Sequence, residues 1–153
     1  MINSIKKKIV ISAVNLTEGG GREVLLSILR TISLDSRYLT IAIVNNKMEG
    51  DLIRSSNIKY LEVPSAKVRW VNRLLYEYYF SRLISKRLHA DIWLSLHDIS
   101  PNVVTKKRYV YCHNIAPFYE FKFSDIRLDP KFSLFVLFYK WIYRININTN
   151  NAI

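Results

Sequence analysis

Two histidines of this chain stand where they could orient a hydroxyl group or move a proton. His97 is followed by Asp98 in the segment "LSLHDIS", and His113 is followed by Asn114 in the segment "VYCHNIA". Imidazole is the side chain best suited to proton transfer near neutral pH. A single histidine is more often structural than catalytic. Because two of the chain's 3 histidines follow comparable strand-like segments, we favour a site that contains both.

Several other chemistries fit the same residues poorly. The one cysteine, Cys112, excludes an internal disulfide and is typical of a reducing compartment. In a strand it and His113 would point to opposite faces, which argues against a Cys–His nucleophilic pair. Two separated histidines and one cysteine lack the spacing of zinc ligands, so we expect no metal. The third histidine, His89, is expected to be a surface or helix-cap residue.

Three of the chain's 4 glycines are consecutive, at Gly19, Gly20 and Gly21. They lie between a strand-like run and a helix-like run. Glycines there let a phosphate approach the backbone, and the free N–H groups of the helix N-terminus face that anion. The dinucleotide fingerprint fails, because Val24 occupies its third glycine position, and the phosphate-loop sequence is absent. A turn that only needs positive φ is the alternative, and three glycines at this point favour the ligand.

Strand-like and helix-like segments alternate along the chain. The predicted strands are Lys8–Leu16, Tyr38–Asn46, Ile58–Pro64, Asp91–Leu96 and Arg108–Asn114. The predicted helices are a first one after the glycines, a short one over Met48–Ser56, a long one over Val68–Leu88 and a last one over Phe132–Arg144. This alternation predicts an α/β fold: one domain over residues 1–153, with a Rossmann-like parallel sheet and helices on both faces. Ligands of such sheets bind beyond the carboxyl ends of the strands, where the glycines and both histidine pairs are expected.

The net charge of +11 favours anionic partners, which are phosphate groups, acidic lipids or nucleic acid. The long predicted helix has an apolar face that includes Val71, Leu74, Leu75 and Tyr78. Its expected basic side carries Arg69, Arg73, Arg82, Lys86 and Arg87. Aromatic residues are interleaved with these arginines, as in helices that lie on anionic membranes, and a solvated helix face is the alternative. Nucleic acid ranks lower because no recognised binding motif is present.

No uncharged apolar run is long enough to span a bilayer, and no convincing targeting segment is present. The longest candidate, Phe132–Ile147, is interrupted by Lys140 and Arg144. We therefore expect a cytoplasmic protein that is peripheral at the inner face of the cell membrane.

The glycine loop, "DIWLSLHD" and "RYVYCHN" together resemble the N-terminal domain of GT-B-fold glycosyltransferases, most closely the retaining family 4 enzymes of bacterial surface-polysaccharide synthesis. The segment "VYCHNIAPFY" is similar to the histidine-bearing segment after the fifth strand of that family. In the family, an N-terminal Rossmann-like domain mainly holds the acceptor. A C-terminal one holds the nucleotide-sugar donor.

The resemblance implies roles for individual residues. Gly20 and Gly21, with Gly19 before them, match the loop whose backbone approaches the donor diphosphate. His113 matches the histidine near the reacting sugar and is the implied catalytic residue. The implied acceptor-side residues are His97, Asp98 and Asn114. The co-substrate would be a nucleotide-diphosphate sugar and the partner a saccharide or lipid-linked acceptor, with no further cofactor.

The chain also departs from the family pattern. It lacks the C-terminal donor domain, and its last residues, Ala152 and Ile153, read as the start of another strand. We therefore expect an incomplete N-terminal domain that is inactive alone. It would be a fragment, a truncated gene product or a split subunit whose donor domain is supplied by a separate chain. The alternative is a non-catalytic α/β binding or membrane-docking module, in which the glycines only turn the chain.

Overall fold

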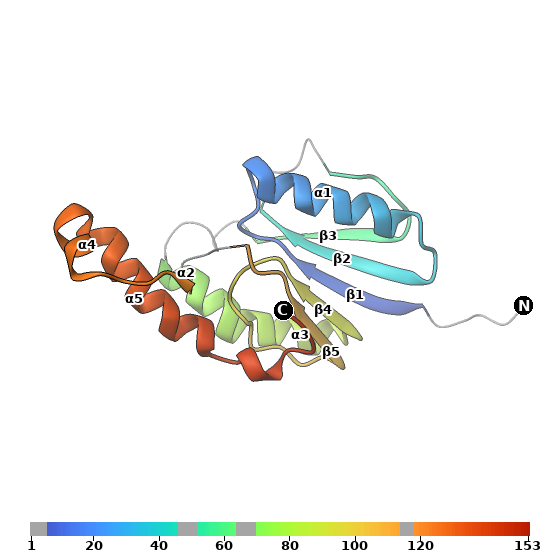
Figure 1. The fold of residues 1–153 in the computed structure, drawn as a ribbon. Helices are drawn as coiled ribbons and strands as arrows, with labels where there is room; N and C mark the ends of the chain where they lie inside the picture. Colours follow the sequence, from blue (N-terminus) through green and yellow to red (C-terminus); the bar gives the residue numbers. More distant parts are fainter. Residues whose placement is uncertain (1–5, 46–51, 64–69, 114–117) are drawn as a thin grey trace, which may run out of the picture.

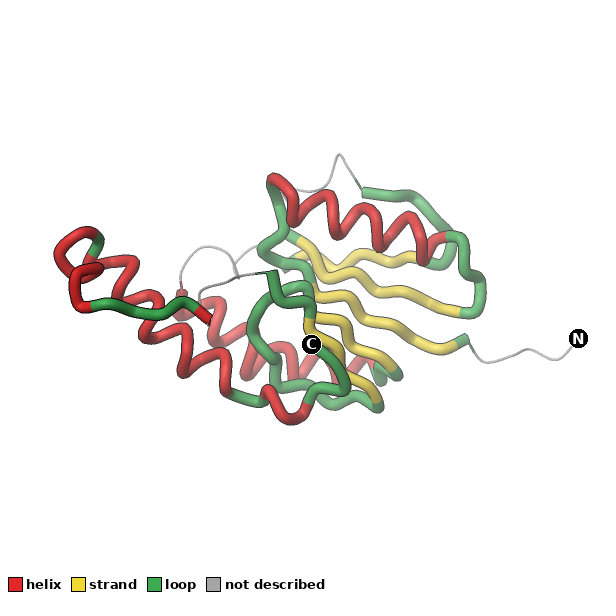
Figure 2. Tube along the Cα trace, viewed as in Figure 1, coloured by secondary structure: helices red, strands yellow, loops and turns green. Residues whose placement is uncertain are grey.

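A computed structural model describes residues 6–45, 52–63, 70–113 and 118–153. Their centre is a five-stranded, all-parallel sheet in the order β3-β2-β1-β4-β5 (Figures 1 and 2). The strands are β1 (Lys7–Ser12), β2 (Tyr38–Val44), β3 (Ile58–Glu62), β4 (Ile92–Ser95) and β5 (Lys107–Val110). The expected Rossmann-like α/β fold is confirmed. Because the strand order changes direction between β1 and β4, the ligand-binding crevice of such sheets is expected at the carboxyl ends of these two strands.

Helices cover both faces of the sheet, as the alternation predicted (Figure 1). Helix α1 (Gly19–Ser33) lies on one face. On the other face lies one continuous helical stretch, made of α2 (Trp70–Leu75), a π-helical segment η3 (Tyr76–Phe80) and α3 (Ser81–Leu88). The chain then forms α4 (Phe123–Leu128), α5 (Pro130–Arg144) and a short 3-10 helix η5 (Ile147–Thr149). In the described parts of the chain, no helix combines the length and hydropathy that a bilayer crossing needs.

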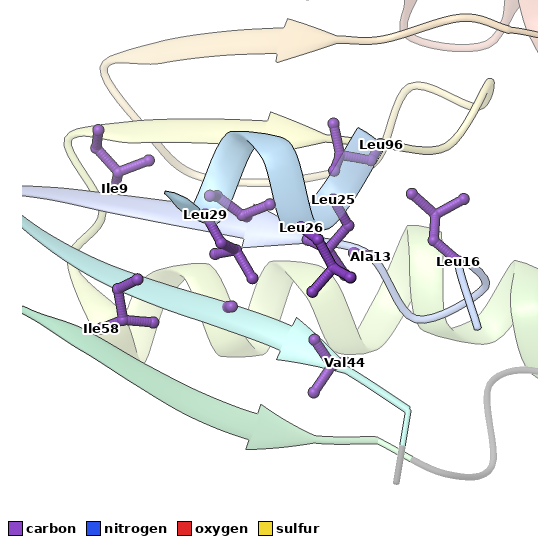
Figure 3. Packing of buried hydrophobic residues seen from close by; sticks show 11 residues of the cluster. Ile9, Ala13, Leu16, Leu25, Leu26, Leu29, Val44, Ile58 and Leu96 are labelled. Atoms are coloured by element: carbon purple, nitrogen blue, oxygen red, sulfur yellow. The ribbon is translucent and has the colours of Figure 1, made fainter. Parts of the chain in front are cut away.

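The central strand β1 is buried on both faces, which explains its continuous apolar sequence. Ile9 and Ile11 pack toward α1, and Val10 packs toward the long helical stretch on the other face. From α1, Leu25 and Leu29 reach this core, and both are fully buried (Figure 3). The hydrophobic core therefore consists of two layers, one on each side of the sheet.

The strands are shorter than predicted at their carboxyl ends. The first was expected to reach Leu16, but β1 ends at Ser12. Ala13, Val14 and Leu16 are nevertheless buried, because Ala13 and Leu16 pack in the cluster with α1 and Val14 packs in the cluster on the other face. In this segment the apolar run therefore indicates that the residues are buried, although they do not form a strand.

Two predicted helical regions differ from the structure. The short helix over Met48–Ser56 lies partly outside the described residues, and residues 52–55 form no helix. Helix α4 forms before Pro130, in a region where no helix was predicted. Asp125 in its first turn accepts a hydrogen bond from the backbone N–H of Lys122 at 2.9 Å, which stabilises this helix start.

The predicted apolar face of the long helix was wrong in part. Val71 is 64% exposed and Leu75 is 48% exposed, whereas Glu77, Ser81 and Ser85 are buried. Both buried serine hydroxyls form hydrogen bonds. The Ser81 hydroxyl donates to the backbone carbonyl of Glu77, and Ser85 Oγ accepts a hydrogen bond from the backbone N–H of Val104. The π-helical segment also changes the angular spacing of the side chains between the two halves of the helix.

The end of the chain pairs with the edge strand β5. Ala152 forms an isolated parallel bridge with Tyr109, and the backbone N–H of Asn151 donates to the carbonyl of Arg108 at 2.7 Å. The sequence predicted the start of another strand at Ala152 and Ile153. In the structure Ala152 forms this one bridge, and residues 152–153 form no strand.

Candidate functional site

The sheet brings the predicted site segments to one edge. Because β1, β4 and β5 are parallel neighbours, the residues that follow them emerge at the same end of the sheet. Gly19 to Gly21 follow β1, His97 and Asp98 follow β4, and His113 follows β5 (Figure 1). Asn114 lies outside the described residues.

The three glycines form the first turn of α1 and have different structural reasons to be glycine. Gly19 has φ +62°, a left-handed conformation that favours glycine. A Cβ on Gly21 would lie 2.8 Å from Leu16 Cδ2, so a side chain there would force Leu16 to move. Gly20 is exposed, has no positive φ, and a Cβ on it would meet nothing within 4 Å. The fold therefore explains two of the glycines and leaves Gly20 unexplained.

Asp98 connects His113 to helix α5. Its Oδ1 atom accepts a hydrogen bond from the backbone N–H of His113 at 2.8 Å and lies 3.3 Å from Nδ1 of the same residue. Its Oδ2 atom accepts a hydrogen bond from the Tyr139 hydroxyl at 3.0 Å. Asp98 is 7% exposed and the His113 side chain is 45% exposed. The buried carboxylate thus orients an imidazole that reaches the surface, with Nδ1 toward Asp98 and Nε2 as the remaining nitrogen.

His97 lies in a buried polar cluster. Its side chain is 1% exposed, and Nε2 lies 3.1 Å from Ser12 Oγ at the end of β1. Ser12 Oγ lies 2.7 Å from the hydroxyl of Tyr76, a residue of η3 on the sheet face opposite α1. Burial lowers the pKa of His97 well below its ordinary value, and the positive charge of Arg73 adds to this. His97 is therefore neutral and linked to β1, and it presents no surface to a ligand.

Glu77 is a member of this cluster that the sequence analysis did not single out. Its side chain is fully buried, and Oε1 lies 3.7 Å from His97 Nε2. Within the described residues, neither carboxylate oxygen has a hydrogen-bond partner. Burial raises the pKa of Glu77 to about 8, and the nearby Arg73 opposes this shift. The one indication in the sequence was an acidic residue in the middle of the aromatic segment "YEYYF".

The basic residues of the long helix divide into two groups. Arg82, Lys86 and Arg87 are exposed, and Arg82 donates to Asn102 Oδ1 at 3.0 Å. Arg73 is half-buried and acts electrostatically on Glu77 and His97, so its surroundings differ from those of the exposed three. Arg69 lies outside the described residues. His89 is the C-cap of α3, as expected, with a left-handed backbone.

Within the described ranges, no group of three His, Cys, Asp or Glu residues is placed to hold a metal ion. The chain matches no family model, no curated protein and no solved structure. The chemistry of the strand-end residues must therefore carry any functional assignment.

Proposed function

We propose that this chain is the acceptor-side domain of a glycosyltransferase that uses a nucleotide-diphosphate sugar. The observation that carries the proposal is the pair of features at one sheet edge: the exposed Gly20 at the start of α1, and the imidazole of His113 oriented by Asp98. The first suits a diphosphate and the second suits a sugar hydroxyl. Both lie at the strand ends where ligands of Rossmann-like sheets bind.

The proposed reaction breaks the bond between the anomeric carbon of the sugar and the diphosphate oxygen. A new bond forms from that carbon to an acceptor hydroxyl, whose proton is released. The leaving diphosphate gains negative charge, which the N–H groups at the start of α1 can stabilise. His113, with Nδ1 held by Asp98, can accept a hydrogen bond at Nε2 from a sugar or acceptor hydroxyl.

In this proposal His97 and Asp98 act on the acceptor side through protein contacts and not by lining the surface. Asp98 orients His113, and His97 fixes the ends of β1 and β4 through Ser12. A second Rossmann-like domain would hold most of the nucleotide. The acceptor would be a saccharide or a lipid-linked saccharide, which fits a cytoplasmic protein peripheral at the inner membrane face.

An NMR titration of the ¹⁵N-labelled chain with a panel of nucleotide-diphosphate sugars tests the proposal. We expect the amide signals of Gly19, Gly20 and His113 to shift first. Gly20→Ala is the matched variant, because it adds a methyl group to open space while crowding the path of a phosphate to the backbone. Unchanged spectra with every sugar nucleotide, or equal shifts in Gly20→Ala, would refute the proposal.

A second candidate is a membrane-docking module without transfer activity. It is favoured by the many large apolar side chains that the C-terminal helices leave exposed. The two candidates are compatible, since a transferase acting on a lipid-linked acceptor also needs a membrane surface.

A further inference from the structure

Helix α5 carries an outward apolar stripe in addition to its inward one. Ser133, Val136 and Tyr139 are buried against the rest of the fold. The stripe consists of exposed residues at helical spacing: Leu134 (61%), Leu137 (45%), Phe138 (67%), Trp141 (74%) and Ile145 (46%) just past the helix end. Their spacing of i, i+3, i+4, i+7 and i+11 places them along one side of the helix. A soluble surface helix normally has polar residues in these positions.

Aromatic residues are concentrated in the same region. Of the 7 phenylalanines in the chain, all but Phe80 lie between residues 118 and 138. Phe123 and Leu128 of α4 are each more than four-fifths exposed. Figure 1 shows α5 reaching past the sheet, with α4 folded back along its outer end. The helical pair α4–α5 therefore presents apolar side chains on a part of the molecule that stands away from the sheet.

All charged residues of α5 are basic. The helix carries Lys131, Lys140 and Arg144 and no acidic residue. With about 100° between successive residues, Lys131 lies on one side of the stripe and Lys140 and Arg144 lie on the other. Nearby acidic residues are used in helix capping: Asp129 Oδ1 accepts the backbone N–H of Phe132 at 2.9 Å. Cations flanking a Leu, Phe and Trp stripe are the pattern of a helix that lies in the membrane interface.

Contacts on its inner side attach α5 firmly to the fold. The Tyr139 hydroxyl donates to Asp98, and Val136 and Tyr139 pack on the buried Ile99. The surface of the outward stripe contains a hollow, which is lined by Leu134, Leu137, Phe138 and Trp141. It is therefore a surface of a fixed helix that offers side chains to something outside.

We propose that the outward stripe of α5 inserts into the headgroup and acyl-chain boundary of an anionic phospholipid bilayer. A bilayer accounts for the apolar stripe and for its basic flanks together, since lysine and arginine can reach anionic headgroups while the rings enter the boundary. The net charge of +11 adds long-range attraction to the same surface.

This inference deepens the peripheral-membrane part of the proposed function and locates the contact on α5 instead of the basic side of the long helix. It also links the membrane to the site. Tyr139, on the inner side of α5, holds Asp98, which orients His113. A lipid-linked acceptor would thus be presented beside the helix that positions the catalytic imidazole.

Vesicle sedimentation with the whole chain tests the inference. The vesicles contain phosphatidylcholine either alone or with about a quarter of phosphatidylglycerol. We expect binding to the anionic vesicles and at least tenfold weaker binding by Phe138→Ser/Trp141→Ser, whose two side chains are exposed and contribute little to folding. The matched control is Val71→Ser/Leu75→Ser, which removes two exposed apolar side chains from α2 and should bind like the wild type.

A charge reversal separates the two basic surfaces. Lys131→Glu/Arg144→Glu should lose the preference for anionic vesicles, whereas Arg82→Glu/Lys86→Glu should keep most of it. The inference would be overturned if the wild type does not bind vesicles, or if the stripe variant binds them equally well. It would also be overturned if the wild type does not bind vesicles but is a dimer in light scattering, and the stripe variant is a monomer. The last result would assign the stripe to a second copy of the chain. The nucleotide-sugar titration is done without vesicles, so either test can fail alone.

Discussion

His97 Nε2 lies 3.7 Å from Glu77 Oε1, and both side chains are at most 1% exposed. Burial disfavours the charged form of each group, so it raises the pKa of Glu77 to about 8 and lowers the pKa of His97. At neutral pH the pair consists of a protonated carboxyl and a neutral imidazole. It is a buried acid and base at the ends of β1 and β4 and not an ion pair.

The pair predicts how stability depends on pH. The ordinary pKa values are 4.5 for Glu77 and 6.5 for His97. Unfolding releases a proton from Glu77 between pH 4.5 and about 8, so this group lowers the free energy of unfolding as pH rises through that window. Unfolding takes up a proton on His97 below pH 6.5, so this group lowers the free energy of unfolding as pH falls below that value.

The two effects oppose each other below pH 6.5, and Glu77 alone acts above 6.5. We expect a loss of about 2 kcal/mol between pH 6.5 and 8 in the wild type. Glu77→Gln, which stays neutral, should remove this alkaline loss and keep the acid one. Urea denaturation across the pH range measures both. An unchanged alkaline slope in Glu77→Gln would show that Glu77 is already ionised in the fold.

Tyr139→Phe is expected to destabilise the fold by about 1–3 kcal/mol, because it leaves Asp98 Oδ2 without this buried hydrogen bond. The His113 amide signal should also shift, since the same carboxylate binds its N–H. Tyr78→Phe is the matched control: its hydroxyl reaches the Ile142 carbonyl only at 3.5 Å, so we expect less than about 0.5 kcal/mol. Urea denaturation compares the two variants. Equal losses would contradict the role given to Asp98.

The parallel direction of the strands could be predicted from the sequence, because strands alternate with helices and buried parallel strands leave long apolar runs. The order of the strands in the sheet was not predicted. The same signal overstated β1, since Ala13 to Leu16 are buried outside it. The strand-end positions of His97 and His113 were also predictable. Their exposure was not, because it depends on packing between distant elements: His97 is covered by the helix that carries Tyr76, and Asp98 by α5.

The inner face of the long helix could not be predicted from periodicity. A regular helix buries positions about 3.6 residues apart, but five residues of η3 are π-helical and change that spacing. Glu77 and Ser85 are buried where an apolar face would be expected to exclude them. Helix α4 was missed because it is short and begins with hydrogen bonds of Asp125 and not with an apolar pattern.

The three glycines should respond differently to alanine. Gly19→Ala is expected to cost about 1–2 kcal/mol, because its φ of +62° disfavours a side chain. Gly21→Ala should cost about 1 kcal/mol, since Leu16 must move to admit the methyl group. Gly20→Ala should be neutral or stabilising by up to about 1 kcal/mol. Thermal and urea denaturation give the order, and a large loss in Gly20→Ala would contradict the view that the fold does not require a glycine at this position.

Two non-glycine residues in the described part of the chain have a left-handed backbone, and both predict a gain in stability on substitution. His89 has φ 48° and Asn146 has φ 61°. The His89 side chain is exposed at the C-cap of α3, and its backbone N–H donates to Ser85 O at 3.1 Å, a bond that glycine keeps. His89→Gly should therefore stabilise the fold by about 0.5–1 kcal/mol, and His89→Ala should not. Asn146→Gly should gain only a few tenths of a kcal/mol, about 0.3, because asparagine tolerates this conformation better than histidine. A loss of stability in His89→Gly, measured by urea denaturation, would mean that the imidazole makes a contact worth more than the backbone strain.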